Sequence, residues 1–558
     1  MRASLRQVLF RSTAGLDLNF AGGAFSLNNT RTDTPAAIPG WSFSRTDTNG
    51  TATALDLAGN VIQFPSRTNS LFPSNNFGDA RWSDFSTGTT TRTSGFSDPE
   101  GGTTAWRLQG NNANTWWGNS GGTAAPPSGG TWASKTATFS MWVRADAAYT
   151  AVLILNFNGG TSYSLNISVT DTWQRFTFTQ TFVAGDTNTL RGVINHKSGN
   201  NTYVFGAQIE ETSTATAYIP TTTAAVTVVL PRITNRGILV EEARTNVITT
   251  SAFQTLSGTA PTQFPSGTGW SNFFATGGTR SFVASTVFAG GQAASLAGVT
   301  AARNVLGFSF SPTASTTYTV SFFVEAASGV TGTVAYASGT LGVGGTTNLV
   351  SAPSATGRYS YTFTTGTGPG VVDLRFGIGT TTNESGSLTI SNIQCEAGAF
   401  ATSPIITTGA AGTRGADGGR ITQSPTASGT IIATVRIPTD KNNRRVVGTN
   451  GASAVTPLAY STAGIETYNG SSTLGKTVSM TAGALVTVGV TWESGRRSVT
   501  GAGLAVATDA NAIGSFTEMW FGQDDSLAAG NALNESIVRV QVLPYAVTDA
   551  QLQALTAP

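Results

Sequence analysis

Few side chains in this sequence could carry out catalysis. The single histidine, His196, could act as a general base or bind a metal, but there is no second histidine to complete a metal pair. We interpret it as a loop residue at the end of a strand. The single cysteine, Cys395, lies in the predicted strand NIQCEAG, where we expect a small buried apolar residue rather than a nucleophile. No Gly-x-Ser-x-Gly elbow accompanies either residue.

Adjacent carboxylates are the remaining catalytic candidates, because two carboxylates could cleave a glycan. Neighbouring residues on a strand point to opposite faces, so such neighbours do not form one two-carboxylate site. We expect a structural role for Glu210, which recurs as Glu396, through pairing with Arg175 and Arg358 or through accepting turn N–H groups. The sequence therefore predicts a chain that is not an enzyme. The adjacent pairs are Glu210–Glu211, Glu241–Glu242 and Asp524–Asp525.

Sugar binding is the better hypothesis, because sugars stack on aromatic rings and amides read their hydroxyls. The stretch WRLQGNNANTWWGNSGG (106–122) places tryptophans among Asn and Gly, with Trp132 nearby. The alternative is that one of the adjacent tryptophans is core and the other shields a loop. The candidate carbohydrate-binding residues are Trp106, Trp116, Trp117, Asn114 and Asn119.

Charge and hydropathy narrow the partners. The net charge is +2, with 31 basic and 29 acidic residues and no Lys/Arg run, so nucleic acid is a poor partner. No apolar stretch approaches the roughly 18 residues of a membrane span, so we expect no membrane insertion. No EF-hand-like Asp pattern exists, and a structural calcium ion with unnamed ligands is the one cofactor left open.

The expected location follows from three features. One cysteine permits no intrachain disulfide, and the first 20 residues lack the apolar core of a signal peptide. Charged residues make up 11% of the chain, well below the roughly 25% of an ordinary globular protein. We therefore expect a virion component made in the host cytoplasm, or a cargo of a secretion system that needs no signal.

The elements that must position these residues are almost all strands. Short aromatic or β-branched runs, several alternating with period two, are separated by Gly, Asn, Asp and Ser. Evenly spaced short strands predict an all-β chain of sandwiches or jelly rolls with very little helix. The one helix signal is VTDAQLQAL (547–555), with Thr548 or Asp549 as its cap. The clearest strands are 137–145, 151–157, 162–169, 174–182 and 202–210.

Four blocks of the sequence recur in the same order, which indicates two copies of one β-module. In the longest match, IEETSTATAYIPTTTAAVT (209–227) aligns without a gap with CEAGAFATSPIITTGAAGT (395–413). The other matches join SRTNSLFPS to ARTNVITTS, TFSMWV to TVSFFV, and TWQRFTFT to TGRYSYT. The offset grows from 177 to 186 residues, as loop insertions produce.

We predict four regions from this organisation. Residues 1–66 form an N-terminal β segment that attaches the chain to a particle, and 67–229 form the first jelly roll. Residues 230–413 contain a linker strand and the second jelly roll, and 414–558 form a separate C-terminal sandwich.

Several of these stretches resemble recurring segments of tailed-phage structural proteins with carbohydrate-binding-like jelly-roll modules. They are FSRTDTNGTATALDLAGNVI, PRI…RGILVEEARTN, TFSMWVRA, DTWQRFTFT, YVFGAQIEE…AYIPTT and TRGAD. The closing RVQVLPYAVTDAQLQAL is similar to the end of concanavalin-A-like (laminin-G-like) sandwiches. In that family the FSR…AGNVI segment leads directly to PRI…RGILVEEARTN, so the first module looks like an inserted duplicate.

The resemblance implies a virion tail, fibre, spike or similar appendage protein, often trimeric. Its partners would be other phage structural proteins and host cell-surface polysaccharide, and it would form a homo-oligomer. Two alternatives stay open. One is a tailspike-type enzyme that degrades polysaccharide, and the other is a purely structural capsid, collar or baseplate component.

Overall fold

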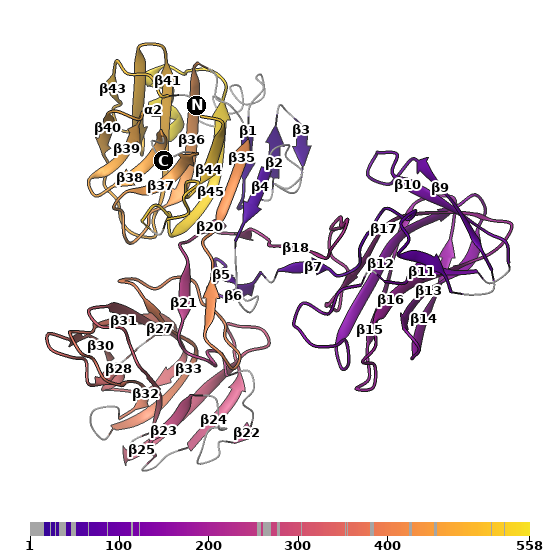
Figure 1. The fold of residues 1–558 in the computed structure, drawn as a ribbon. Coiled ribbons are helices and arrows are strands. Elements are labelled where there is room, and N and C mark those ends of the chain that lie inside the picture. The colour runs from indigo at the N-terminus through magenta and orange to yellow at the C-terminus, as the bar shows by residue number, and fades with distance from the viewer. Residues whose placement is uncertain are drawn as a thin grey trace. The chain divides into compact units, whose positions relative to one another are not determined.

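The chain forms two compact units (Figure 1). One is the first module, residues 66–230, and the other combines residues 1–65 with 231–558. The first module is thus an insertion into the second unit. The computed structural model describes residues 16–22, 24–27, 30–32, 41–45, 52–64, 66–85, 88–112, 115–121, 123–253, 258–259, 269–275, 279–302, 304–351, 353, 355–379, 384–422, 427–450, 455–514, 516–528 and 530–558.

The first module is a jelly-roll sandwich of two five-stranded antiparallel sheets. The β12 sheet has the order β15-β12-β17-β10-β9, and the β13 sheet has the order β14-β13-β16-β11-β8. The five strands that the sequence predicts in this module are all present, with ends within two residues. The strands are β8 (Trp82–Asp84), β9 (Thr90–Phe96), β10 (Ala105–Gly110), β11 (Thr115–Asn119), β12 (Thr136–Ala145), β13 (Tyr149–Phe157), β14 (Ser162–Val169), β15 (Gln174–Thr181), β16 (Leu190–His196) and β17 (Asn201–Glu210).

The second module repeats this topology strand for strand. Its β27 sheet has the order β22-β24-β25-β33-β27-β31-β29, and its β28 sheet has the order β23-β26-β32-β28-β30. Without the edge strands β22 and β29, the two orders match those of the first module. The strands are β22 (Gly258–Thr259), β23 (Trp270–Ala275), β24 (Thr279–Ala284), β25 (Gln292–Ala302), β26 (Asn304–Phe310), β27 (Thr317–Ser328), β28 (Thr333–Gly339), β29 (Thr346–Thr347), β30 (Leu349–Ser351), β31 (Gly357–Thr364), β32 (Val372–Ile378) and β33 (Glu384–Ala397).

Each module is closed at its base by the same device. The Arg-Thr-Asn strand before the module pairs with a short strand after it: β7 (Arg67–Asn69) with β18 (Val226–Val228), and β21 (Arg244–Asn246) with β34 (Gly412–Arg414). The asparagine of each strand then bonds four backbone groups. Asn69 donates to the carbonyls of Ala207 and Ile219 and accepts from the N–H groups of Leu71 and Ile209.

Asn246 makes the equivalent four bonds in the second module. It donates to the carbonyls of Ile393 and Ile405 and accepts from the N–H groups of Ile248 and Cys395. Both asparagines are fully buried, so their bonds hold the closing strand to the first residues of the module. The repeat seen in the sequence is therefore also a repeat of individual hydrogen bonds.

The third sandwich contains strands from both ends of the chain. Its ten-stranded sheet includes β3-β2-β1-β45-β36-β41-β42-β43, with β20 joined to β45 and β19 to β20, and its seven-stranded sheet has the order β4-β35-β44-β37-β38-β39-β40. The first four strands are β1 (Leu16–Asn19), β2 (Ala24–Leu27), β3 (Thr30–Thr32) and β4 (Trp41–Ser44), and the linker strands are β19 (Arg232–Thr234) and β20 (Gly237–Val240). The rest are β35 (Gly418–Thr422), β36 (Gly429–Arg436), β37 (Arg444–Thr449), β38 (Thr456–Ser461), β39 (Gly464–Tyr468), β40 (Thr473–Thr477), β41 (Leu485–Glu493), β42 (Arg496–Gly501), β43 (Ala507–Asp509), β44 (Glu518–Phe521) and β45 (Glu535–Leu543).

This arrangement corrects the expectation of a separate N-terminal β segment. Strand β1 pairs with β45, with Leu16 opposite Val542, and β4 pairs with β35 (Figure 1). Leu16 and Leu18 are fully buried in the core of the C-terminal sandwich. The described strands before residue 45 therefore complete that sandwich, because their apolar side chains need its core to be buried.

Helix α2 (Asp549–Thr556) is the one helix among the described residues, and it lies where the sequence predicts it. Thr548 caps it: its hydroxyl accepts from the N–H of Gln551, whose side chain reaches back to the N–H of Thr548. Leu552 and Leu555 are fully buried against Ile432.

Candidate functional site

The two adjacent tryptophans of strand β11 point in opposite directions. Trp117 is fully buried and stacks on Trp82, with ring centroids 4.6 Å apart and planes 18° from parallel. Because successive strand residues alternate between faces, Trp116 points to the outer face of the β13 sheet, where it is half-buried. The pair therefore includes one core residue, as the alternative predicted, but the other residue lies on the outer face of a sheet rather than over a loop.

Trp116 belongs to a row of side chains that crosses four strands. It lies opposite Asn195 on β16, which lies opposite Val152 on β13, which lies opposite Asn166 on β14. The inward neighbours Trp117, Ile194, Leu153 and Ile167 are all in the core, so the row faces outward. Asn166 is exposed, and the other three members are half-buried. The outer sheet face thus carries an indole ring, a small apolar side chain and two amides.

The other predicted sugar-binding residues lie elsewhere. Trp106 is on β10 of the β12 sheet, half-buried against the core, so it does not share a face with Trp116. Asn119 is fully buried and donates from Nδ2 to the carbonyl of Phe72 at 3.1 Å. Asn114 lies outside the described residues. The expectation of one exposed platform is wrong for Trp117 and Asn119, because their side chains point from β11 into the interior of the sandwich.

The second module lacks this row. Trp270 occupies the place of Trp82, since the indole of each donates to a backbone carbonyl of the module's first loop. The register from Trp270 onward places Val305 where the first module has Trp116, and Gly377 where it has Asn195. The same sheet face instead carries Arg375, which donates to the hydroxyl of Tyr336 at 2.7 Å. The fold is therefore compatible with either set of side chains on this face.

His196 ends strand β16, as expected, but it is fully buried rather than in a loop. Its Nε2 lies 3.2 Å from the hydroxyl of Thr90, which itself donates to Asp84 at 2.5 Å. Burial lowers the pKa of His196 from 6.5 to about 4, against the opposing attraction of Asp84. The imidazole is accordingly neutral at physiological pH and occupies an interior position.

The recurring glutamates close the turn that follows the last strand of each jelly roll. Glu210 accepts the N–H of Thr216 at 2.9 Å and also its hydroxyl. Glu396 accepts the N–H and the hydroxyl of Thr402, both at 2.7 Å. Accepting turn N–H groups was one of the two structural roles predicted for Glu210. The Arg175 guanidinium donates instead to the hydroxyl of Ser140 at 2.9 Å.

The segments PRI…RGILVEEARTN and TRGAD meet in a buried ion-pair network. The Arg232 guanidinium binds Asp417 with two nitrogens and Glu241 at 2.7 Å. Burial alone would raise the pKa of Glu241, but Arg414 and Arg232 outweigh it and lower the pKa to about 2. Adjacent Glu242 pairs instead with Arg244 and, at 3.6 Å, with Arg444. The two neighbouring carboxylates face different partners, although they lie between β20 and β21 rather than on a strand.

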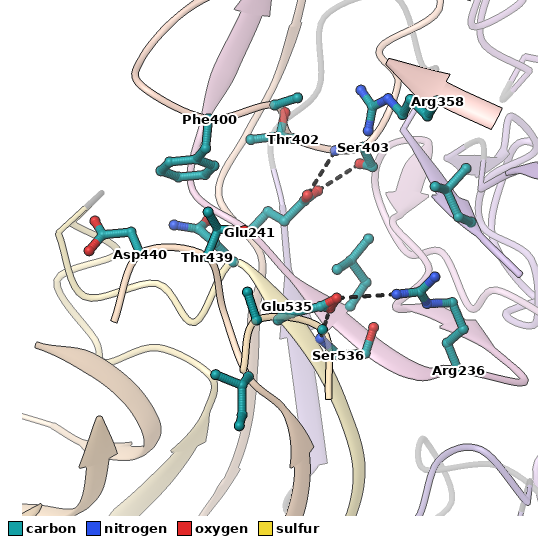
Figure 2. Close-up of a pocket in the computed structure, with 17 residues that line it drawn as sticks. Arg236, Glu241, Arg358, Phe400, Thr402, Ser403, Thr439, Asp440, Glu535 and Ser536 are labelled. Atoms are coloured by element: carbon teal, nitrogen blue, oxygen red, sulfur yellow. Dashed lines mark hydrogen bonds and ion pairs between the residues drawn. The ribbon is translucent and has the colours of Figure 1, made fainter. Parts of the chain in front are cut away.

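A pocket of about 320 Å³ lies between the second module and the C-terminal sandwich, inside the same unit (Figure 2). Its three carboxylates are engaged: Glu241 by Ser403 at 2.6 and 2.8 Å, Glu535 by Arg236 at 3.2 Å, and Asp440 by Arg444. Burial raises the pKa of Glu535, partly offset by Arg236. The Glu241–Ser403 bonds join the segment after β20 to the exit of the second module, whereas the Glu535–Arg236 pair lies within the C-terminal sandwich.

Three further expectations concern Cys395, metal ions and membrane spans. Cys395 is fully buried, as predicted, and burial raises the pKa of its thiol well above the usual value. Across the described residues, no group of three or more His, Cys, Asp and Glu could hold a metal ion. No helix found there is long and apolar enough to cross a membrane.

No protein-family model and no curated protein matches the chain. Among solved structures, it is similar to the tandem CBM22-1–CBM22-2 domains of Paenibacillus barcinonensis Xyn10C, at 9% identity and a TM-score of 0.22, over 62% of this chain and all of that one. It is also similar to the CBM40 of the Ruminococcus gnavus IT-sialidase (21% identity, TM-score 0.20, 24% and 83% covered) and to mouse laminin alpha1 LG4-5 (14%, 0.17, 43% and 88%). Likenesses this weak carry no weight for function, which must come from the residues themselves.

Proposed function

We propose that this chain is a non-catalytic glycan-binding protein whose first module binds sugar on the outer face of the β13 sheet. The observation that carries the proposal is the row of Trp116, Asn195, Val152 and Asn166 across four strands. An indole can stack against the C–H face of a pyranose, and each amide can both donate to and accept from ring hydroxyls.

The spacing of the row suits an oligosaccharide better than a single sugar. Neighbouring strands lie about 4.8 Å apart, so four strands span roughly 14 Å, the length of about three linked hexoses. Because the row runs across the strands, a glycan chain would lie perpendicular to them. Asn166 at the exposed edge strand would contact the end of the glycan farthest from Trp116.

The wider proposal concerns where the protein works. We infer a structural protein of a tailed-phage appendage, located on the virion, whose partners are other phage structural proteins and host surface polysaccharide. The resemblance of the linker and module segments to such proteins, the tandem modules and the low charge support this. Homo-oligomerisation, with a trimer favoured, belongs to the same proposal, because low-charge β-modules are protected from edge pairing when they assemble.

Binding and catalysis are separated by one experiment on the full chain. A glycan array with wild type, Trp116→Val and the control Thr177→Val tests binding, because Val is the residue of the second module and Thr177 is exposed on the other sheet. We expect wild type and the control to bind the same glycans and Trp116→Val to lose them. Equal binding by all three proteins would show that the row is not the sugar-binding site.

The bound glycan is then incubated with the protein and assayed for new reducing ends. We expect none. Released oligosaccharide would favour the second candidate, a polysaccharide-degrading enzyme. Imaging of particles labelled with an antibody to the chain tests the location: an appendage should be labelled, and labelling absent from every particle would contradict the virion assignment.

A further inference from the structure

A second cavity lies on the other sheet of the first module, away from the row. It has a volume of about 580 Å³, within the range of small-molecule sites. Its apolar side is formed by Phe205 on β17 and by Tyr218, whose ring centroids are 5.4 Å apart at 60°. Its lining comes wholly from the first module: Pro73, Asn75, Asn76, Asp79, Glu100, Thr104, Phe205, Tyr218, Pro220, Thr221, Thr222 and Thr223.

The internal repeat identifies the equivalent position in the second module. Ser74 and Ser251 make matching hydrogen bonds to Thr221 and Thr407, so the next residues, Asn75 and Ala252, correspond. The gapless alignment then places Ile406 where the cavity has Pro220.

A strand bulge fixes the rest of the correspondence. The bulge lies on the last strand of each module, at Gly206 (φ 61°) in the first and at Asn392 (φ 47°) in the second. The residue just past the bulge on the neighbouring strand is Trp142 in the first module and Phe323 in the second, so these two residues correspond. Trp142 packs edge-on against Phe205 at 5.7 Å beside the cavity.

In the second module this position is filled by a hairpin. Strands β5 (Thr53–Leu55) and β6 (Val61–Gln63) form it, and the N–H of Val61 donates to the carbonyl of Val287 at 2.7 Å. Val61 is buried in a cluster with Ala252, Phe288, Phe323 and Ile406, and Leu55 packs against them. In the second module this position on the jelly roll therefore binds the β5–β6 hairpin, which acts as a cap.

The side chains that line the cavity in the first module differ from those at the capped position of the second module. Asn75 replaces Ala252, and Glu100 and Thr104 stand exposed on the loop that corresponds to the loop of Phe288. The rim gains hydroxyl, amide and carboxylate groups, and the aromatic wall is also particular to the first module, because Tyr218 and Phe205 stand where the second module has Pro404 and Ser391. Such a surface no longer matches an apolar hairpin, and it matches a ligand with one apolar face and many hydroxyls.

We propose that this cavity is a second saccharide site, specific for neutral sugars. The carboxylates of Asp79 and Glu100 line it, and the Arg81 guanidinium is already 3.1 Å from Asp79. A uronate or sialate would place its negative charge beside these carboxylates, which is unfavourable. The proposal rests on the proposed function only for the class of ligand, because its residues share no face with Trp116.

The test uses hydrogen–deuterium exchange on the full chain with cello-, malto-, manno- and xylo-hexaose, and with an oligogalacturonate as the acidic probe. We expect a neutral hexaose to protect residues 73–79 and 218–223, and the oligogalacturonate to leave them unprotected. Glu100→Gln, which changes an exposed group, should weaken the neutral sugar about tenfold through loss of a charge-assisted hydrogen bond. Trp116→Val should leave this protection unchanged.

The outcomes separate the two sites. Protection near Trp116 alone would overturn this inference and keep the proposed function. Protection at 218–223 alone would support this inference and overturn the Trp116 row. No protection by any neutral hexaose would overturn this inference. Protection by a synthetic peptide of residues 51–64, and by no sugar, would also overturn it, because the cavity would then be a docking site for a chain segment.

Discussion

Replacing His196 by Gln tests the electrostatics of the core of the first module. In the folded module, burial lowers the pKa of His196 to about 4, whereas the unfolded chain protonates it near 6.5. Above pH 6.5 the imidazole is neutral in both states, so it adds no pH dependence to the free energy of unfolding. As the pH falls, the unfolded state gains the proton first, so stability is lost between pH 6.5 and 4.

The size of the loss follows from the two pKa values. At pH 5 wild type should lose about 2 kcal/mol from this group, and below pH 4 about 3 kcal/mol. For a module of this size, 2 kcal/mol corresponds to a fall in Tm of about 4–8 °C. His196→Gln has no titrating group here and keeps an amide that can reach Thr90, so this part of the pH dependence should vanish.

Differential scanning calorimetry of both proteins at pH 7.5 and pH 5 gives the comparison. Other carboxylates titrate equally in the two proteins, so their effect cancels in the difference. We expect the Tm of the first module to fall further in wild type than in His196→Gln. An equal fall in both would refute the reasoning, because it would mean that the folded imidazole takes up a proton as readily as the unfolded one.

Four further substitutions test the packing and the buried polar contacts. Trp117→Ala should lower the free energy of unfolding of the first module by about 3–5 kcal/mol in urea titrations, and a value below about 1 kcal/mol would contradict its core position. Asn69→Ala and Asn246→Ala should each cost their own module about 2–4 kcal/mol, because four backbone groups lose a partner; calorimetry should show only one transition moving in each variant. Arg232→Met should cost up to about 3–5 kcal/mol, because buried Glu241 and Asp417 would each lose one of two arginine partners and keep only Arg414 and Arg45. The difference in free energy of unfolding between wild type and this variant should shrink as the pH falls from 4.5 towards 2, where wild-type Glu241 loses its charge. A difference that does not change with pH would contradict the pairing.

The local features of the fold could be predicted from the sequence because they depend on local patterns. Alternation located strands such as β12 and β14, and the capping residue located α2. The gapless match of 209–227 with 395–413 indicated the duplicated module, since side chains that close a turn must keep their spacing. Glu210 is an example: its bond to Thr216 spans six residues in both copies.

The long-range features could not be predicted in this way. Nothing local in LDLN (16–19) indicates that it pairs with β45, more than 500 residues later. Alternation requires that one of two adjacent tryptophans face the core, but the choice of Trp117 depends on its stacking with Trp82 from another strand. The burial of His196 depends likewise on neighbouring strands. The ion-pair network joins segments about 180 residues apart, so its motifs could be recognised without revealing that they meet.

The central claim is that sugar binds on the outer face of the β13 sheet. Isothermal titration of the best array glycan into wild type and into the double variant Trp116→Val, Asn195→Gly tests it most directly, because the variant carries the residues of the second module at those positions. We predict that the variant remains folded and loses affinity by about a hundredfold or more, as expected when a stacking contact and an amide are removed together. Equal affinity in the two folded proteins would contradict the claim.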